Sequence, residues 1–408
     1  MTQRIVPAKI GPAQISPVQI SAHGLACATG IGLPALAQAL REGRSALAPN
    51  TWSRVPLETF IGRVQGIETS PLPVAWAAWD CRATRLAWMG LQADGFIDAA
   101  MAARQRHGAA RVGVVLGTSA STIGVSEEAY RTLAGDGGFP APLRSERLNT
   151  LHAVAAFVQQ ALGLEGPCVT VSTACSSSAK AFALAERWLR LNLVDAVVVA
   201  GVDAMCESVL FGFHALRLTA STACRPFDAA RAGISVGEAA GFALLERGSG
   251  ALALLGHGES NDAHHMSSPH PQGLGAEQAL DAALSRAGLA ALDIGYLNLH
   301  GTASARNDEV EAALVARRYA ADVHANATKG STGHTMGAAG IVEALVCLLA
   351  LRDGLCAGSA GTLQVDAALG ASFAAQLQLT PAKRRVRYAA SHSFGFGGNN
   401  AVLIFGTA

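Results

Sequence analysis

Residues 168–201 read CVTVSTACSSSAKAFALAERWLRLNLVDAVVVAG and contain the pattern on which the fold prediction rests. An apolar stretch runs from Cys168 into small residues, and an amphipathic helix is expected to begin near Ser176. The valine-rich run 194–201 follows that helix, and residues 111–117 (RVGVVLG) have a similar composition. Near-continuous apolar strands of this kind are typical of a sheet that helices cover on both faces. The order strand, helix, strand therefore predicts an α/β fold with a parallel sheet.

The same alternation continues toward the C-terminus, which indicates two similar α/β halves. The second half is expected to contain helices and strands at 276–287, 296–300, 308–318, 336–352, 387–391 and 401–405. Residues 248–258 (GSGALALLGHG) hold four glycines after an expected strand at 241–245, so they are the best candidate for the boundary. We therefore expect a leader at 1–17, a first half at 18–249 that begins with a strand at 18–22, and a second half at 250–408.

Composition excludes several classes of protein. The 408 residues are 50% hydrophobic and 15% charged, and Lys+Arg 31 against Asp+Glu 30 gives a formal net charge of +1. This balance is unlike that of a disordered chain, and it argues against nucleic-acid binding and against a basic membrane-surface patch. A membrane span needs about 20 apolar residues. The best candidates, 194–204 and 341–351, are shorter and carry acidic residues, so the apolar residues belong to a buried core.

The eight cysteines form no CxxC pair, and their spacing matches no zinc pattern. Scattered thiols without a secretory signal predict a reduced, cytoplasmic protein. Most of these thiols are expected to be small core residues, but Cys175 lies where an expected strand turns into an expected helix. The free N–H groups and the dipole of a helix N-terminus favour a thiolate, so this layout predicts a nucleophile.

Two further segments combine reactive or flexible residues with turns. In LNLHGTASARNDEVE (297–311), His300 ends a strand and precedes a turn and an acidic helix start. Open α/β sheets bind ligands beyond such carboxyl ends of strands, although an ordinary loop histidine is an equally good interpretation of His300 alone. In SHSFGFGGNN (391–400), the glycines allow the backbone to approach a reacting centre closely.

A third segment, ATKGSTGHTMGAAGIVE (327–343), places Lys329 and His334 on either side of a Gly/Ser/Thr turn. This turn lacks the GxxxxGK[ST] order of a phosphate loop. Taken together, TACSSSAKA, HGT…ND, TKG…TGH…GAAG and SFGFGGNN resemble, in order and spacing, the elongating β-ketoacyl-acyl-carrier-protein synthases. The resemblance extends over nearly the whole chain, from about residue 20 to residue 405.

The resemblance implies the thiolase fold, a layered αβαβα architecture, and a Cys-His-His triad. It makes Cys175 the nucleophile and His300 and His334 the paired histidines. The backbone N–H groups of Cys175 and Phe396 would form the oxyanion hole. The other implied roles are a buried lysine, its acidic network partner, a gating residue and a structural acid: Lys329, Glu343, Phe396 and Asp308, respectively.

The implied substrate is an acyl chain on the 4′-phosphopantetheine arm of an acyl carrier protein, with no separate bound cofactor and no metal. The residues expected to contact the arm or the acyl chain are Thr302, Ser304, Ser267, Ala120 and Gly397. Ser267 and Ser304 stand where the family has threonines and keep a hydroxyl group. Ala120 stands where the family often has a bulky aliphatic residue, so the pocket is expected to admit a wider or stiffer acyl group.

Two features of the sequence are left without a catalytic role. The family motif RPFDxxRDG reads RPFDAARAG here, so that Ala232 replaces an acid, and the sequence does not explain this change. His264, His265 and His270 could be taken for a metal-binding cluster. The corresponding segment of the family is a loop near the pantetheine tunnel, and we therefore predict no metal site there.

The implied reaction is a decarboxylative Claisen condensation. Cys175 takes the acyl group, a malonyl thioester loses CO2, and the chain grows by two carbons while His300 and His334 donate hydrogen bonds to the enolate. Stretches such as GTSASTIG and GVDAMCESVLFGF favour an aryl-polyene or polyketide-like pathway. The alternatives are a housekeeping fatty-acid synthase, a thiolase, which would use a second C-terminal cysteine, and a structural chain-length subunit, which typically lacks the nucleophile.

The implied partners are the acyl carrier protein and a second ketosynthase subunit. Because acyl carrier proteins are acidic, Arg82 and Arg85, three residues apart on an expected helix face, are candidates for a docking patch. An ordinary solvated helix face is an equally good interpretation of these two residues. The family predicts a homodimer, or a heterodimer with a related ketosynthase-like subunit.

Overall fold

Two large β-sheets form the framework of the protein, one in each half of the chain. The computed structural model describes residues 14–133, 138, 146–248 and 250–407. The strand orders are β2-β1-β9-β7-β5-β6 in the first sheet and β10-β16-β15-β11-β12 in the second. The first sheet consists of β1 (Val18–Cys27), β2 (Gly30–Ile31), β5 (Val112–Gly117), β6 (Cys168–Val171), β7 (Ala196–Asp203) and β9 (Ala239–Arg247). The second consists of β10 (Ala253–Asn261), β11 (Tyr296–Asn298), β12 (His324–Asn326), β15 (Tyr388–Gly395) and β16 (Asn399–Gly406).

Both sheets are mixed, whereas the sequence pattern predicted parallel pairing. Strand β5 is parallel to β6 and β7, and β11 is parallel to β12 and β15. The remaining neighbours pair antiparallel: β1 with β2 and β9, β7 with β9, and β16 with β10 and β15. Two small sheets complete the strands: β3 (Ala48–Pro49), β4 (Phe60–Gly62) and β8 (Val236–Gly237), and β13 (Leu355–Cys356) with β14 (Ala382–Lys383).

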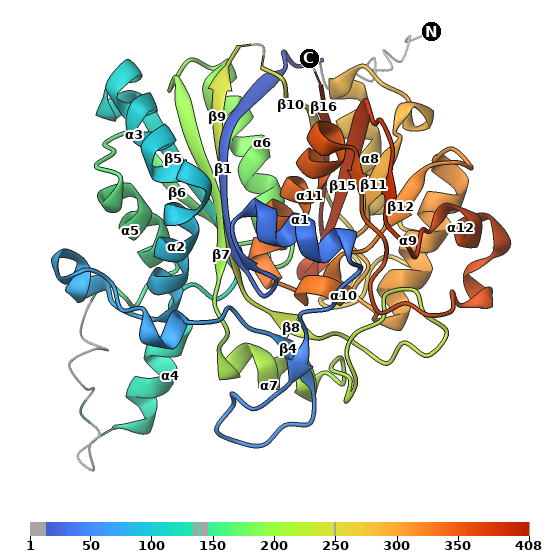
Figure 1. Cartoon of the computed structure of the whole chain (residues 1–408), viewed down its shortest axis with the longest axis horizontal. Helices are drawn as coiled ribbons and strands as arrows, with labels where there is room; N and C mark the ends of the chain where they lie inside the picture. Colours follow the sequence, from blue (N-terminus) through green and yellow to red (C-terminus); the bar gives the residue numbers. More distant parts are fainter. Residues whose placement is uncertain (1–13, 134–137, 139–145, 249, 408) are drawn as a thin grey trace, which may run out of the picture.

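Helices lie between the sheets and on both outer faces, as Figure 1 shows. Helix α6 (Ser177–Arg190) packs on β5 and β7, while α11 (Ala339–Asp353) packs on β15 and on α6. Every residue of α11 from 339 to 351 is buried, because both sheets cover it. The outer helices are α2 (Arg82–Gln92), α3 (Phe96–His107) and α5 (Ala153–Ala161) on the first sheet, and α8 (Leu274–Ala287) and α9 (Ala305–Arg318) on the second. This arrangement has the five layers, αβαβα, that the resemblance implied.

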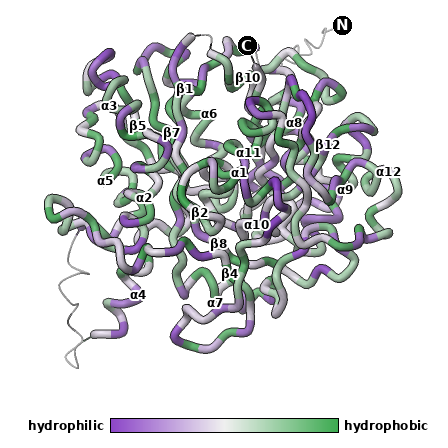
Figure 2. Tube along the Cα trace, viewed as in Figure 1, coloured by the Kyte–Doolittle hydropathy of each residue, from purple (hydrophilic) through white to green (hydrophobic). Residues whose placement is uncertain are grey.

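The remaining helices of the described chain are short. They are α1 (Leu33–Arg41), α4 (Ile123–Arg131), α7 (Glu207–Ala215), α10 (Lys329–Thr332) and α12 (Ala371–Gln376). Hydrophobic residues recur through the strands and helices of both halves rather than in one of them (Figure 2). Among the described helices, none has the length and hydropathy needed to cross a bilayer.

Only some of the glycines at 248–258 lie in the segment that connects the two halves. Gly256 and Gly258 lie inside β10, directly under α8. A Cβ at Gly258 would stand 1.7 Å from the carbonyl oxygen of Ala279, and one at Gly256 would stand 2.3 Å from that of Ala283. These glycines therefore allow a helix to pack closely on a strand, which the sequence pattern alone does not distinguish from a linker.

Most of the expected leader, residues 1–13, lies outside the described part of the chain. Its last residues contact the second half: the backbone N–H of Ile15 donates to the carbonyl oxygen of Arg286 over 3.0 Å, and the side chain of Ile15 is buried. Arg286 belongs to α8, so residues near position 15 pack beside that helix before β1 begins in the first sheet.

Candidate active site

Cys175 lies in a tight turn between β6 and α6. Ala174 has a φ of 51°, a left-handed conformation that is uncommon for a residue with a side chain. Hydroxyl groups close the turn: the Oγ of Ser176 donates to the carbonyl oxygen of Thr173 over 2.9 Å, and the Oγ of Ser177 donates to that of Ala174 over 2.6 Å. These hydroxyl groups thus fix the carbonyl groups of the turn, and Cys175 lines the cavity described below.

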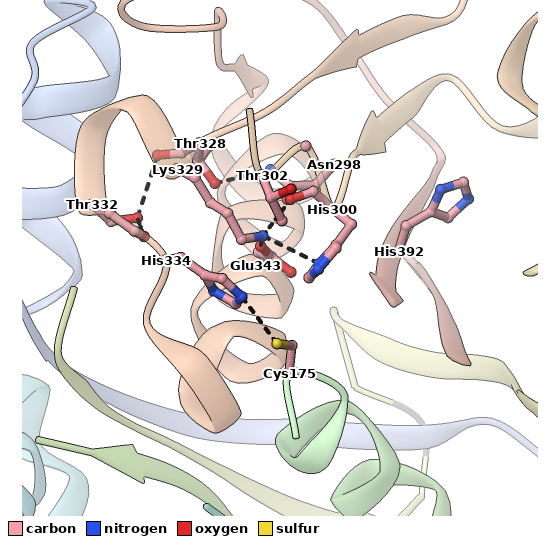
Figure 3. Close-up of polar contacts among 12 residues, drawn as sticks. Cys175, Asn298, His300, Thr302, Thr328, Lys329, Thr332, His334, Glu343 and His392 are labelled. Atoms are coloured by element: carbon pink, nitrogen blue, oxygen red, sulfur yellow. Dashed lines mark hydrogen bonds and ion pairs between the residues drawn. The ribbon is translucent and has the colours of Figure 1, made fainter. Parts of the chain in front are cut away.

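The second half of the chain supplies the partners of this thiol. His334 follows α10, and its Nε2 lies 3.0 Å from the Sγ of Cys175. His300 follows β11, and its ring is nearly perpendicular to that of His334, with 5.4 Å between the ring centres. The Sγ of Cys175 and one ring nitrogen of each histidine all lie within 4.8 Å of one another. Figure 3 shows the two imidazoles and the thiol converging from separate segments.

The hydrogen-bond partners of the histidines determine where their protons lie. The backbone N–H of Met336 donates to Nδ1 of His334 over 3.3 Å, and the ammonium of Lys329 lies 3.3 Å from Nδ1 of His300. Because Nδ1 accepts in both rings, the ring hydrogen of each neutral imidazole lies on Nε2. Burial and the nearby Lys329 hold the pKa of both histidines well below the ordinary value. Both side chains are therefore neutral N–H donors at physiological pH.

Lys329 is buried beneath the histidines, with 2% of its surface exposed. Its ammonium donates to the carboxylate of Glu343 on α11 and to the backbone carbonyl oxygen of His300. Burial raises the pKa of Glu343 to about 7, while the positive charge of Lys329 acts in the opposite direction. The ion pair therefore connects α10, α11 and the turn after β11 directly below the reactive thiol.

Burial also determines the protonation of Cys175. Desolvation raises the pKa of this thiol to about 11, although Lys329 and a hydrogen bond from the N–H of Phe396 lower it. Burial therefore opposes the thiolate that the helix N-terminus favours. The side chain is 6% exposed, and the loss of solvation outweighs the favourable charges.

The glycine-rich turn after β15 covers the thiol. The ring of Phe396 lies 5.7 Å from that of Phe213, which in turn faces His334 at 6.4 Å. Gly397 has a φ of 74°, and its N–H donates to the carbonyl oxygen of Met266 over 2.7 Å. Phe396 thus lines the cavity beside Phe213, and the next residue of its turn bonds to Met266.

The triad opens into a cavity of about 400 Å³. Its lining includes five further positions singled out in the sequence: Ser267, Thr302, Ser304, Phe396 and Ala232. Arg217 and Arg306 also line it, and both are exposed to solvent. Gly397 and Ala120 are not among the lining residues of this cavity. Ala120 is buried, and its backbone N–H donates to Asp203 over 2.9 Å.

Three buried acids hold the backbone of the site. Asp308 accepts from the N–H of Phe227 over 2.7 Å and from that of Thr302 over 3.2 Å, which is the geometry a structural acid needs. Burial raises the pKa of Asp308 to about 7. The roles of the other two acids, Asp203 and Glu311, were not predicted from the sequence.

Asp203 and Glu311 each accept several backbone N–H groups. Asp203 accepts from Ser119, Ala120 and Gly337, and thereby connects β5 to the turn before α11. Glu311 accepts from both His300 and Gly301 over 2.8 Å. An acid at the end of an apolar strand was a signal for Asp203, because a buried carboxylate needs donors. No comparable local signal marked Glu311.

Arg82 and Arg85 already have partners within the chain. The guanidinium of Arg82 donates to both oxygens of buried Glu238 over 2.6–2.8 Å and also reaches Glu68. That of Arg85 donates to both oxygens of Asp80 over 2.5–2.7 Å. These ion pairs neutralise both cations, so the geometry favours a structural role over the docking role that the sequence suggested.

The histidine cluster at 264–270 bonds largely to its own loop. Nδ1 of His265 accepts the N–H groups of Ser267 and Ser268 over 3.2 Å, and Nδ1 of His270 accepts that of Gln272 over 3.2 Å. The ring of His264 packs edge-on against that of His270 at 5.1 Å. These contacts account for the local positions of the rings, and none of these histidines contacts the triad through a described bond.

Comparisons with known proteins decide the family. Residues 80–251 match the model for the N-terminal domain of β-ketoacyl synthases, and residues 252–362 match the model for their C-terminal domain. The chain belongs to the β-ketoacyl synthase family. It is therefore an acyl-transferring condensing enzyme that joins an acyl group to malonyl-ACP, and the predictions of family, fold and reaction are confirmed.

Curated relatives include a nodulation protein and a 3-oxoacyl-[acyl-carrier-protein] synthase. Nodulation protein E of Rhizobium meliloti (strain 1021) is 36% identical over 309 residues, which cover 73% of this chain and 76% of that protein. The 3-oxoacyl-[acyl-carrier-protein] synthase 2 of the same strain is 38% identical over 263 residues, which cover 59% and 61%, respectively.

Solved structures extend the similarity to the entire fold. A ketosynthase (ApeO) in complex with its chain length factor (ApeC) from Xenorhabdus doucetiae is 33% identical, with a TM-score of 0.87 and coverage of 100% of both chains. The ishigamide ketosynthase/chain length factor is 25% identical, with a TM-score of 0.84 and coverage of 96% of this chain and 99% of the other.

The buried thiol makes a specific prediction for alkylation. With a pKa of about 11, the thiolate fraction of Cys175 rises about tenfold for each pH unit across the whole interval from pH 7 to 10. The rate of iodoacetamide alkylation, measured at Cys175 by peptide mass spectrometry, should therefore rise through pH 10 without a plateau. A cysteine-containing peptide with an ordinary pKa of about 8.5 serves as control and should level off earlier. A plateau of the Cys175 rate at or below pH 8 would contradict the assignment of a neutral thiol.

Proposed function

We propose that this β-ketoacyl synthase forms its acyl-enzyme at Cys175 and uses His300 and His334 as paired N–H donors in the condensation. The observation that carries the proposal is the joint geometry of the three groups. The Sγ of Cys175 lies 3.0 Å from Nε2 of His334, and the proton of both neutral imidazoles lies on Nε2. A nucleophile and two donors therefore face the same end of the cavity.

The first half-reaction transfers the acyl group from the carrier to the enzyme. Sγ of Cys175 attacks the thioester carbonyl, the bond from that carbon to the pantetheine sulfur breaks, and the thiol proton of Cys175 ends on the released pantetheine sulfur. The backbone N–H groups of Cys175 and Phe396 are proposed as the oxyanion hole. A thiol that loses its proton only as the substrate enters is protected from other electrophiles before then.

The second half-reaction forms the new carbon–carbon bond. The malonyl thioester loses CO2, and the electron pair of the broken bond remains on the thioester as an enolate. The Nε2–H groups of His300 and His334 stabilise the enolate oxygen. The enolate carbon then attacks the acyl group on Cys175, the carbon–sulfur bond breaks, and the Cys175 thiolate takes up a proton. Lys329 donates a hydrogen bond to Nδ1 of His300 and so keeps that nitrogen an acceptor. The ring hydrogen of His300 therefore stays on Nε2, which faces the substrate.

Replacement of His300 should separate the two half-reactions. Loss of one oxyanion donor costs about 10²–10³-fold in rate, so His300→Leu should slow CO2 release from malonyl-ACP by that factor. Acylation of Cys175, which uses other donors, should stay within about threefold of wild type. His300→Gln keeps an N–H near the position of Nε2 and should recover part of the loss. Radiolabelled CO2 release and acyl-enzyme mass measure the two steps.

A matched control exists on the neighbouring strand. His324 on β12 is also buried, and its Nε2 bonds to the backbone oxygen of Ala357 over 2.7 Å. His324→Leu removes a buried imidazole without touching the triad, so it should affect both half-reactions equally. If His300→Leu also slows both half-reactions equally, the role proposed for His300 is wrong.

We further propose that the enzyme works in a secondary-metabolite pathway, together with a second ketosynthase-type subunit. The similarity to ApeO, which was solved with a chain length factor, supports this proposal over the full length of the chain. The position of β6 at the end of the first sheet supports it as well. Among the described strands β6 pairs with β5 alone, Val169 on it is 37% exposed, and an edge strand can add another strand. Fatty-acid elongation is the second candidate, favoured by the 38% identity to a 3-oxoacyl-ACP synthase 2.

Isolation from the native host tests the pathway and the subunit together. The affinity-tagged enzyme is purified under mild conditions that keep the acyl group attached. Native mass spectrometry should then give the mass of a complex of two different ketosynthase-type chains. The adduct on Cys175 should have the mass of a polyunsaturated or otherwise rigid acyl group. A homodimer carrying saturated acyl groups would instead establish fatty-acid elongation and would overturn the pathway proposal.

A further inference from the structure

A chain of three buried side chains lies behind His300 and takes no part in the mechanism above. The hydroxyl of Tyr319 lies 2.8 Å from Nε2 of His392, and Nδ1 of His392 lies 3.0 Å from Oε1 of Glu311. His392 and Glu311 are fully buried, and Tyr319 is 5% exposed. Figure 3 shows His392 on the far side of His300 from the thiol.

The chemistry of these groups gives the chain a direction. Both oxygens of Glu311 accept backbone N–H groups, Oε1 from His300 and Oε2 from Gly301, each over 2.8 Å. Nδ1 of His392 therefore supplies the hydrogen in its contact with Glu311. The remaining nitrogen, Nε2, accepts the hydroxyl hydrogen of Tyr319. Two side chains thus orient the carboxylate that holds the backbone at His300.

The turn that Glu311 holds has little room to adjust. Gly301 has a φ of 34°, and a Cβ there would stand 2.4 Å from the Cβ of Ala327. A carboxylate that rotates away from the two N–H groups would leave them buried without acceptors, which is unfavourable. The orientation of Glu311 is therefore coupled to the position of the His300 backbone.

His392 also packs against a ring that faces His300. His392 lies on β15, and its ring is 5.1 Å from that of Phe394 on the same strand. The ring of Phe394 in turn lies 6.0 Å from that of His300. Phe394 lines the catalytic cavity, and the same strand leads into the turn that carries Phe396. His392 is thus placed to hold both the backbone and one ring neighbour of His300.

We infer that Tyr319, His392 and Glu311 form a positioning chain that sets the direction of the His300 donor. The inference rests on the proposed role of His300 in the decarboxylation step. None of the three side chains reaches the reacting atoms; they act through the backbone of His300 and Gly301. Misplacement of a catalytic group by about 1 Å costs about 10²-fold in rate, so the chain should affect the step that needs His300 more than the step that does not.

Three single variants test the positioning chain in the full-length enzyme. His392→Leu removes both hydrogen bonds and should slow CO2 release from malonyl-ACP about 10- to 100-fold, while acylation of Cys175 stays within about threefold. His392→Asn retains an N–H near the position of Nδ1 and should recover most of the CO2-release rate. Tyr319→Phe deletes a single oxygen atom and should produce a smaller loss, confined to the same step.

Controls separate this inference from general stability and from the proposed function. His324→Leu, a buried histidine on β12 without contact to the chain, should show no difference between the two steps. Equal loss of both half-reactions in His392→Leu, or no loss in either, would overturn the positioning role. Failure of the wild-type enzyme to acylate Cys175 would instead refute the proposed function. Tyr319→Phe keeps the test decisive if His392→Leu does not fold.

Discussion

The buried ammonium of Lys329 is the interaction on which the catalytic geometry depends. Removal of an ammonium from water costs several kcal/mol unless partners replace the lost hydration, and here they are the carboxylate of Glu343, the carbonyl oxygen of His300 and its Nδ1. This set of contacts leaves the ring proton of His300 on Nε2, facing the substrate. The same positive charge lowers the pKa of the two histidines and, opposing burial, that of Cys175.

The doubled fold brings these groups together because the two halves contribute different parts. The first half supplies Cys175 at the start of α6. The second half supplies His300 after β11, Lys329 and His334 at and after α10, and Glu343 on α11. Asp203 joins the halves by accepting N–H groups from the end of β5 and from the turn before α11. The low charge content noted in the sequence matches α11, which lies between two sheets and is buried from residue 339 to residue 351, with Glu343 as the one charged residue in that stretch.

Local patterns predicted the groups that react, and long-range contacts determined what could not be predicted. Cys175, His300, Lys329 and His334 each stand in a distinctive turn, so the α/β halves and these positions were accessible from sequence. The burial that raises the pKa of Cys175 was not predicted, because it depends on segments far away in the chain. The ion pair of Arg82 with Glu238 and the hydrogen bond from the His300 backbone to Glu311 were not predicted, because each joins residues from different elements.

The most direct test of the account follows the acyl group through one turnover by mass spectrometry. Incubation with an acyl-loaded carrier should place one acyl group on the peptide that contains Cys175. Addition of malonyl-ACP should then remove that group and yield a β-ketoacyl carrier two carbons longer, with release of CO2. An adduct on another cysteine, or discharge of the Cys175 adduct as free acid without chain extension, would contradict the account.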